Sequence, residues 1–204
     1  MRPGLLLTSA LLASALRATV PAGASAQATH AAHRAERTAA SSGPTTTDQA
    51  LIANALSAAP ASLTAGATVM GHDGRVLRKG TSDWVCMPDM PDVPNDTPMC
   101  LDAPWRALID AWMNKRPATV TQMGFGYMLQ GDMPVSNVDP FATAPTSTNQ
   151  WIPRGDPHVM VLVPDRKLLD GLATDPKSGG PFVMWKGTPY AHIMLPTTAA
   201  PKTP

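Results

Sequence analysis

Glutamate is almost absent from this chain of 204 residues, in which Glu36 is the only one. A pair of catalytic carboxylates must therefore consist of two aspartates, and no spacing among the aspartates singles out such a pair. The Gly-x-Ser-x-Gly, His-Glu-x-x-His, Gly-x-Gly-x-x-Gly and P-loop motifs are also lacking. These absences lower the expectation of catalysis, although an enzyme does not need a known motif.

Excess positive charge and long apolar runs are missing too. From residue 48 onward, fourteen aspartates face twelve lysines and arginines, and no basic stripe is present. The sequence therefore lacks the cluster of basic residues that is typical of nucleic-acid-binding proteins. After the first 28 residues no apolar run approaches the ~20 residues of a membrane-spanning helix. We expect no nucleic-acid partner and no transmembrane segment in the mature protein.

The first 28 residues have the pattern of a secretory signal peptide. Arg2 precedes an apolar stretch over residues 5–13, and small residues lead to Ala26 and Ala28, the expected cleavage positions. The alternative is a disordered, alanine-rich leader. Residues 29–47 form a low-complexity Ala/Thr/Ser spacer, which cannot bury enough apolar surface to fold. The expected organisation is a signal peptide (1–28), a disordered spacer (29–47), one domain (48–196) and a disordered tail (197–204), with the product exported to the periplasm or secreted.

Cysteine is scarce, since Cys86 and Cys100 are the only two. In an oxidising compartment an even pair at this separation predicts a disulfide. Closing a loop of about 15 residues contributes about 3 kcal/mol in the chain-entropy model. The spacing is not that of a redox-active Cys-x-x-Cys pair. Five prolines over residues 86–104 predict that the enclosed segment is a loop.

The periodicity of the remaining segments predicts an α+β domain. Thr47 or Asp48 is the expected cap of a short helix that ends at Pro60, and an apolar stripe predicts a second helix over 103–115. Asp73-Gly74 predicts a hairpin between residues 67–70 and 75–78. Gly124 and Gly126 in the strand expected over 119–129 indicate close approach of another element. With a central strand at 158–163 and a second hairpin near the C-terminus, the expectation is a single domain with a mostly antiparallel sheet, two hairpins, about two helices and one disulfide.

The second hairpin carries the candidate ligand-binding residues. A four-residue turn over 186–189 would pair Trp185 with Tyr190 and place Val183 opposite His192. Trp185, Tyr190 and His192 would then share one face, which His158 on a neighbouring strand is placed to join. Two aromatic rings and an imidazole offer apolar area and a group that titrates near neutrality. We expect this face to be partly open and to line the main pocket. The competing interpretation is that the helix over 103–115 closes it.

Three functional hypotheses remain open. The leading one is an exported domain that binds a small molecule or an envelope protein partner. The second is a hydrolase-type enzyme that uses His192 or His158 with an aspartate. The third is a copper- or calcium-binding envelope protein. Met87, Met90 and Met99 offer soft sulfur ligands for Cu(I), and oxygen ligands for calcium are offered by Asp89, Asp92, Asn95 and Asp96.

Several stretches resemble an uncharacterised group of exported bacterial proteins. The resemblance rests on Asp102–Trp105, Trp112–Lys115, Tyr127–Asp132, Asp139–Thr143 and Gly180–Met194. It covers most of residues 48–196 and implies export. The group has no established activity, so the resemblance implies no substrate, cofactor or catalytic residue.

Overall fold

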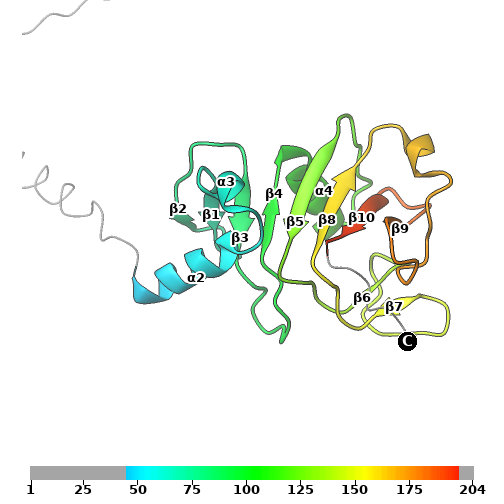
Figure 1. The fold of residues 1–204 in the computed structure, drawn as a ribbon, viewed down its shortest axis with the longest axis horizontal. Helices are drawn as coiled ribbons and strands as arrows, with labels where there is room; N and C mark the ends of the chain where they lie inside the picture. Colours follow the sequence, from blue (N-terminus) through cyan, green and yellow to red (C-terminus); the bar gives the residue numbers. More distant parts are fainter. Residues whose placement is uncertain (1–44, 198–204) are drawn as a thin grey trace, which may run out of the picture. The chain divides into compact units, whose positions relative to one another are not determined.

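The computed structural model describes residues 45–197 and shows an α+β fold (Figure 1). The expected signal peptide, most of the expected spacer and all but the first residue of the expected tail lie outside the described residues. The helices are α2 (Thr46–Leu56), α3 (Ala61–Thr64), α4 (Ala103–Met113) and the 3₁₀ turn η1 (Arg166–Leu169). None of the helices in this part of the chain is long and apolar enough to cross a membrane.

One eight-stranded sheet organises the domain. Its order is β2 (Val76–Arg78), β1 (Thr68–Met70), β3 (Val85–Met87), β4 (Met99–Leu101), β5 (Gly124–Met128), β8 (His158–Leu162), β10 (His192–Pro196) and β9 (Phe182–Met184). All neighbours are antiparallel except β1 and β3. A separate two-stranded sheet pairs β6 (Val135–Ser136) with β7 (Trp151–Ile152). The expected mostly antiparallel α+β fold is confirmed.

Helix α2 begins earlier than its sequence pattern predicts. Thr45, rather than Thr47 or Asp48, is its N-cap: the Thr45 hydroxyl accepts from the Asp48 N–H, and the Asp48 carboxylate accepts from the Thr45 N–H. This reciprocal pair satisfies two backbone donors that a helix start leaves free. The expected spacer boundary at residue 47 is therefore wrong by about three residues, because the cap lies inside the low-complexity stretch.

Cys86 and Cys100 form the expected disulfide, and none of the described cysteines is free. Their surroundings differ from the expected loop. They are directly opposite residues on β3 and β4, with Cα atoms 4.0 Å apart. Four of the five prolines lie next to the strands or in the turn between them, and Pro104 lies in the first turn of α4, so none interrupts the ladder. The disulfide therefore fastens a hairpin.

The two glycines of β5 explain how α4 packs on the sheet. A Cβ atom on Gly124 would come within 2.8 Å of Pro104 Cβ, and one on Gly126 within 2.9 Å of a Leu101 methyl group. Larger residues there would push α4 and its neighbours away, which confirms the close approach that the sequence predicts. Helix α4 begins at its N-cap Asp102, whose side chain accepts the Trp105 N–H.

The sheet is covered on both faces. One face packs against α4 and holds the largest buried cluster, which includes Trp105 and Leu108. On the other face, α2 covers the disulfide end, and Leu169 of η1 covers Val161 and Val183. Figure 1 shows α2 at the β1–β3 end and α4 beside β4 and β5. The functional question is which side chains this covering leaves accessible.

Candidate functional site

The second hairpin has a different register from the expected one. His192 pairs with Met184 and Ile193 with Val183, so residues 185–191 form the connection in place of a four-residue turn. Trp185 follows the strand with a φ of 54°. Its backbone N–H donates a hydrogen bond to the Asn137 carbonyl, and its indole N–H donates one to the Ser136 carbonyl. These hydrogen bonds to residues far away in the sequence hold Trp185 in a position that the expected four-residue turn would not allow. His192 therefore shares its face with Met184, and Val183 faces the opposite side.

The expected openness of this face is also wrong. Trp185, Tyr190 and His192 are buried, with His192 only 2% exposed. Trp105 of α4 meets the His192 ring edge-on at a centroid distance of 4.9 Å, and Trp185 meets it at 5.2 Å. Helix α4 closes the face, as in the competing interpretation. The assignment of these residues to ligand binding stays a prediction, but it now requires the face to open.

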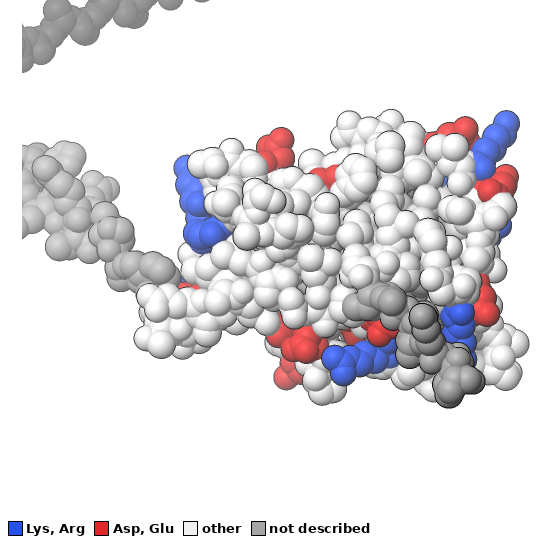
Figure 2. Space-filling view, viewed as in Figure 1, with Lys and Arg blue, Asp and Glu red and all other residues white. Residues whose placement is uncertain are grey.

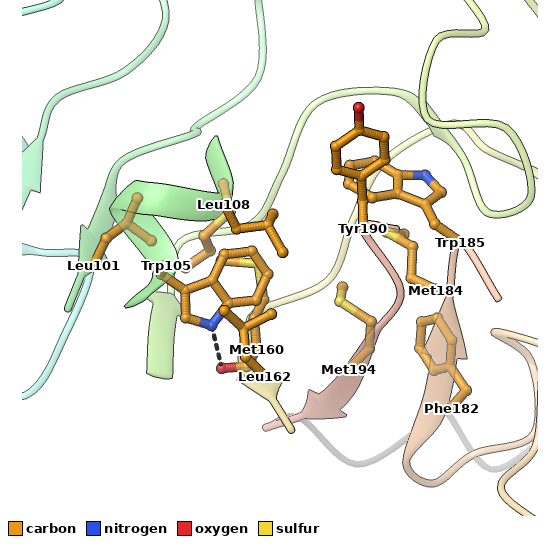
Figure 3. Packing of buried hydrophobic residues seen from close by; sticks show 11 residues of the cluster. Leu101, Trp105, Leu108, Met160, Leu162, Phe182, Met184, Trp185, Tyr190 and Met194 are labelled. Atoms are coloured by element: carbon orange, nitrogen blue, oxygen red, sulfur yellow. Dashed lines mark hydrogen bonds between the residues drawn. The ribbon is translucent and has the colours of Figure 1, made fainter. Parts of the chain in front are cut away.

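This closed cluster is tied together by directed polar contacts. Trp105 donates its indole N–H to the Met160 carbonyl at 3.2 Å (Figure 3). The Tyr190 hydroxyl donates to the Arg116 carbonyl just beyond α4. His192 Nδ1 is 2.9 Å from the Tyr190 carbonyl, whereas its Nε2 has no hydrogen-bond partner. Burial lowers the pKa of His192 to about 4, so its ring is neutral at pH 7.

His158 lies in a separate small cavity of about 70 Å³, lined also by Asp132 and Arg154. Its Nδ1 is 2.6 Å from the Asp156 carbonyl, and its buried Nε2 has no hydrogen-bond partner. Burial raises the pKa of Asp132 above its ordinary value, and the nearby His158 opposes this shift. The described residues include no salt bridge between the two side chains. The cavity therefore places an imidazole near a carboxyl group without a direct hydrogen bond.

The larger of the two cavities described in residues 45–197 is a groove that sequence reasoning missed. It has a volume of about 570 Å³ and an almost entirely apolar wall. Five methionines contribute to this wall, with aromatic residues, His72 and Lys115 at its margins. We call this site the methionine groove; its lining is His72, Met87, Met90, Pro91, Thr97, Met99, Ile109, Trp112, Met113, Lys115, Asp132, Met133 and Phe141. Asp132 also borders the cavity of His158.

Three parts of the fold bring these methionines together. Met87 and Met99 are cross-strand partners on the disulfide hairpin, and Met90 follows in its turn. Met113 ends α4, and Met133 lies in the loop after β5. These methionines therefore come from separate segments between residues 87 and 133. The sequence signal was the concentration of Met87, Met90 and Met99 around the cysteines.

Asp89, one of the residues proposed to bind calcium, has a structural role instead. Asp89 accepts the Asn54 amide N–H at 2.7 Å and the Thr97 backbone N–H at 2.7 Å, with one carboxylate oxygen for each. It thereby fastens the disulfide hairpin to α2. Over residues 45–197, no group of three or more His, Cys, Asp or Glu side chains is arranged to hold a metal ion. The calcium hypothesis gains no support from this geometry.

The described part of the chain thus has an open, sulfur-rich groove, a closed aromatic core and a small cavity that contains His158. Comparison with protein-family models, curated proteins and solved structures finds no match to this chain.

Proposed function

We propose that the protein is an exported binding protein that holds a small apolar molecule in the methionine groove. The observation that carries the proposal is the groove itself, whose volume of about 570 Å³ falls within the range of small-molecule sites. Its wall is apolar, with Lys115 and Asp132 as its only charged side chains. A ligand with an apolar body therefore fits it better than a strongly charged one.

The methionine side chains suit this role. Met is unbranched and has a polarizable thioether, so it adapts its shape to irregular ligands. Met113 is 71% exposed at the groove margin, which places it to move over a bound molecule. Trp112 supplies a more rigid wall, because its indole stacks on Trp185 and donates to the Pro140 carbonyl. The groove thus combines one fixed side with one adaptable side.

Export is part of the same proposal. The leader pattern of residues 1–28, the resemblance to exported bacterial proteins and the closed disulfide all favour an oxidising compartment. Mass spectrometry of the protein from its host tests this directly, with Gln27 or Thr29 expected as the first residue. A full-length intracellular product with reduced cysteines would contradict export.

The charged surface is the other feature relevant to partners. In the view of Figure 2, lysines and arginines lie apart and form no continuous patch.

The hydrolase hypothesis has less support. His158 and Asp132 do border one cavity, but general base catalysis needs the base within hydrogen-bond reach of its proton donor. Neither the small cavity nor its lining presents an activated serine or cysteine nucleophile. His192 is enclosed between two tryptophans. The binding proposal needs no rearrangement of these groups.

A neutral fluorescent probe tests the binding proposal. N-phenyl-1-naphthylamine brightens in apolar sites, and we expect saturable binding to the full-length protein. Met113→Lys places a charge against the apolar wall, so it should weaken binding at least about tenfold, or 1.4 kcal/mol. Met123→Lys is the matched control, because Met123 is 53% exposed and does not line the groove. Equal effects of the two substitutions, or no saturable binding, would overturn the proposal.

A further inference from the structure

Four soft or borderline metal ligands line the methionine groove. They are the thioethers of Met87, Met90 and Met99 and the imidazole of His72. We propose that these four side chains form a binding site for a single Cu(I) ion. The proposal is independent of the apolar ligand, because it concerns the donor atoms of the wall and not its hydrophobicity.

The disulfide hairpin places two of the thioethers side by side. Met87 on β3 is the direct cross-strand partner of Met99 on β4. Directly opposite residues have Cβ atoms about 4.5–5.5 Å apart and point to the same face. The neighbouring pair, Cys86 and Cys100, points to the other face and is bridged there. The disulfide thus fixes the spacing of the Cβ atoms of Met87 and Met99 without supplying ligands itself.

Hydrogen bonds in the turn hold the third thioether near this pair. The Met90 N–H donates to the Thr97 hydroxyl at 2.8 Å, and the Thr97 N–H donates to the Asp89 carboxylate at 2.7 Å. Thr97 is buried, so the turn folds back over the strand ends. Met90 therefore lines the same groove as Met87 and Met99 instead of extending into solvent.

His72 reaches the site from the other hairpin, in the turn between β1 and β2. Its Nε2 lies 2.9 Å from the Pro88 carbonyl, and a carbonyl only accepts, so Nε2 carries the proton. Nδ1 then keeps a free lone pair. Metal-bound histidines commonly have this arrangement, in which a backbone carbonyl fixes the tautomer and orients the ring. Because Pro88 follows Met87 directly, this hydrogen bond holds the His72 ring beside the backbone of the strand that carries Met87.

This set of atoms selects a soft monovalent ion. Thioethers favour Cu(I), imidazole accepts copper readily, and carboxylate-rich sets suit calcium or magnesium. Of the groove's lining residues, only Asp132 has a carboxylate. The cysteines are bridged, so no thiolate competes for the metal. Binding requires no redox step, since copper enters and stays as Cu(I).

Competition with bicinchoninate, a coloured Cu(I) chelator, tests the proposal on the unreduced full-length protein under anaerobic conditions. We expect one Cu(I) per chain. Met87→Leu with Met99→Leu should weaken binding at least about thirtyfold, as should His72→Phe with Met90→Leu. Leucine nearly conserves the volume of methionine, so loss of the fold is not the expected cause. Met123→Leu is the matched control and should bind copper as the wild type does.

Two results would overturn the copper site: no Cu(I) held against bicinchoninate, or equal affinity in the Met87→Leu/Met99→Leu variant and the Met123→Leu control. The same variants separate this proposal from the apolar ligand. Phenylnaphthylamine should bind Met87→Leu/Met99→Leu within about threefold of the wild type, because leucine keeps the wall apolar. Loss of copper with retained probe binding supports both proposals. Retained copper in this variant overturns the copper site alone, whatever happens to the probe, because the apolar-ligand proposal is tested by Met113→Lys against Met123→Lys.

Discussion

The closed core under α4 and the methionine groove are built from the same kinds of side chain. The core combines Met184 and Met194 with Trp105 and His192, whereas the groove combines five methionines with Trp112 and His72. The core histidine is 2% exposed, and the groove histidine is exposed. Composition therefore does not tell a ligand surface from a core. What decides is whether a helix lies over the face.

The largest expected effect comes from removing the side chain that closes the core. Trp105 is 1% exposed and its indole N–H is hydrogen-bonded, so Trp105→Ala should lower the free energy of unfolding by about 3–5 kcal/mol. Trp105→Phe retains part of the ring and should cost less. Urea denaturation of both variants measures the difference. A loss below about 1 kcal/mol for Trp105→Ala would show that the face under α4 is loosely packed.

Removal of the disulfide should affect both regions, but for different reasons. Cys86→Ala with Cys100→Ala releases a loop closure worth about 3 kcal/mol of stability. The shape of the groove should change as well, because Met87 directly follows Cys86 and Met99 directly precedes Cys100. We expect weaker phenylnaphthylamine binding together with the lower unfolding free energy. Wild-type protein reduced by dithiothreitol is the control, and it should reproduce both changes.

The pH dependence of stability distinguishes a buried histidine from an exposed one. The pKa of His192 is about 4 in the folded protein, against an ordinary value of about 6.5 in the unfolded chain. Between these values the unfolded chain binds more protons, so stability rises with pH through this window. The contribution of the neutral His192 ring to the free energy of unfolding is fully present above about pH 6.5 and is lost as the pH falls to about 4. Its size is about 3 kcal/mol.

Replacement of His192 isolates this contribution from that of the carboxylates. His192→Phe preserves a flat ring between Trp105 and Trp185, so the fold should persist. The difference in unfolding free energy between the variant and the wild type should change by about 3 kcal/mol between pH 7 and pH 4. Urea denaturation at both pH values measures it. A constant difference would show that His192 titrates normally and that the core admits water.

Local pattern was sufficient for much of the fold. The apolar stripe predicted α4, the glycines of β5 predicted its close approach, and the cysteine pair predicted the disulfide. The register of the second hairpin was not predictable in this way. It depends on Trp185, which bonds to residues 136 and 137 far away in the sequence. A tight turn was the best local solution, and a long-range contact replaced it.

The candidate site was predicted less well than the fold. Sequence alternation grouped Trp185, Tyr190 and His192 through a register that is wrong. Trp185 and Tyr190 nevertheless lie in one buried cluster, and Trp185 contacts the His192 ring. Alternation says nothing about what lies above a strand. The methionine groove draws on two hairpins, the end of α4 and a loop. Of the groove methionines, only the three around the cysteines are close enough to one another in sequence to form a recognisable group. Met113 and Met133 join them through tertiary packing, which no local pattern records.

The smallest expected effect on stability belongs to the groove. Met113 is 71% exposed, so Met113→Ala should change the free energy of unfolding by no more than about 0.5 kcal/mol. It should still weaken phenylnaphthylamine binding about fourfold, because losing contact with one methylene costs about 0.8 kcal/mol. Met123→Ala should leave both quantities unchanged. Denaturation and fluorescence titration of the same samples separate the two effects. If Met113→Ala lowered stability without changing binding, Met113 would belong to the core of α4. The contrast between an open groove and a closed face would then fail at the groove's most exposed methionine.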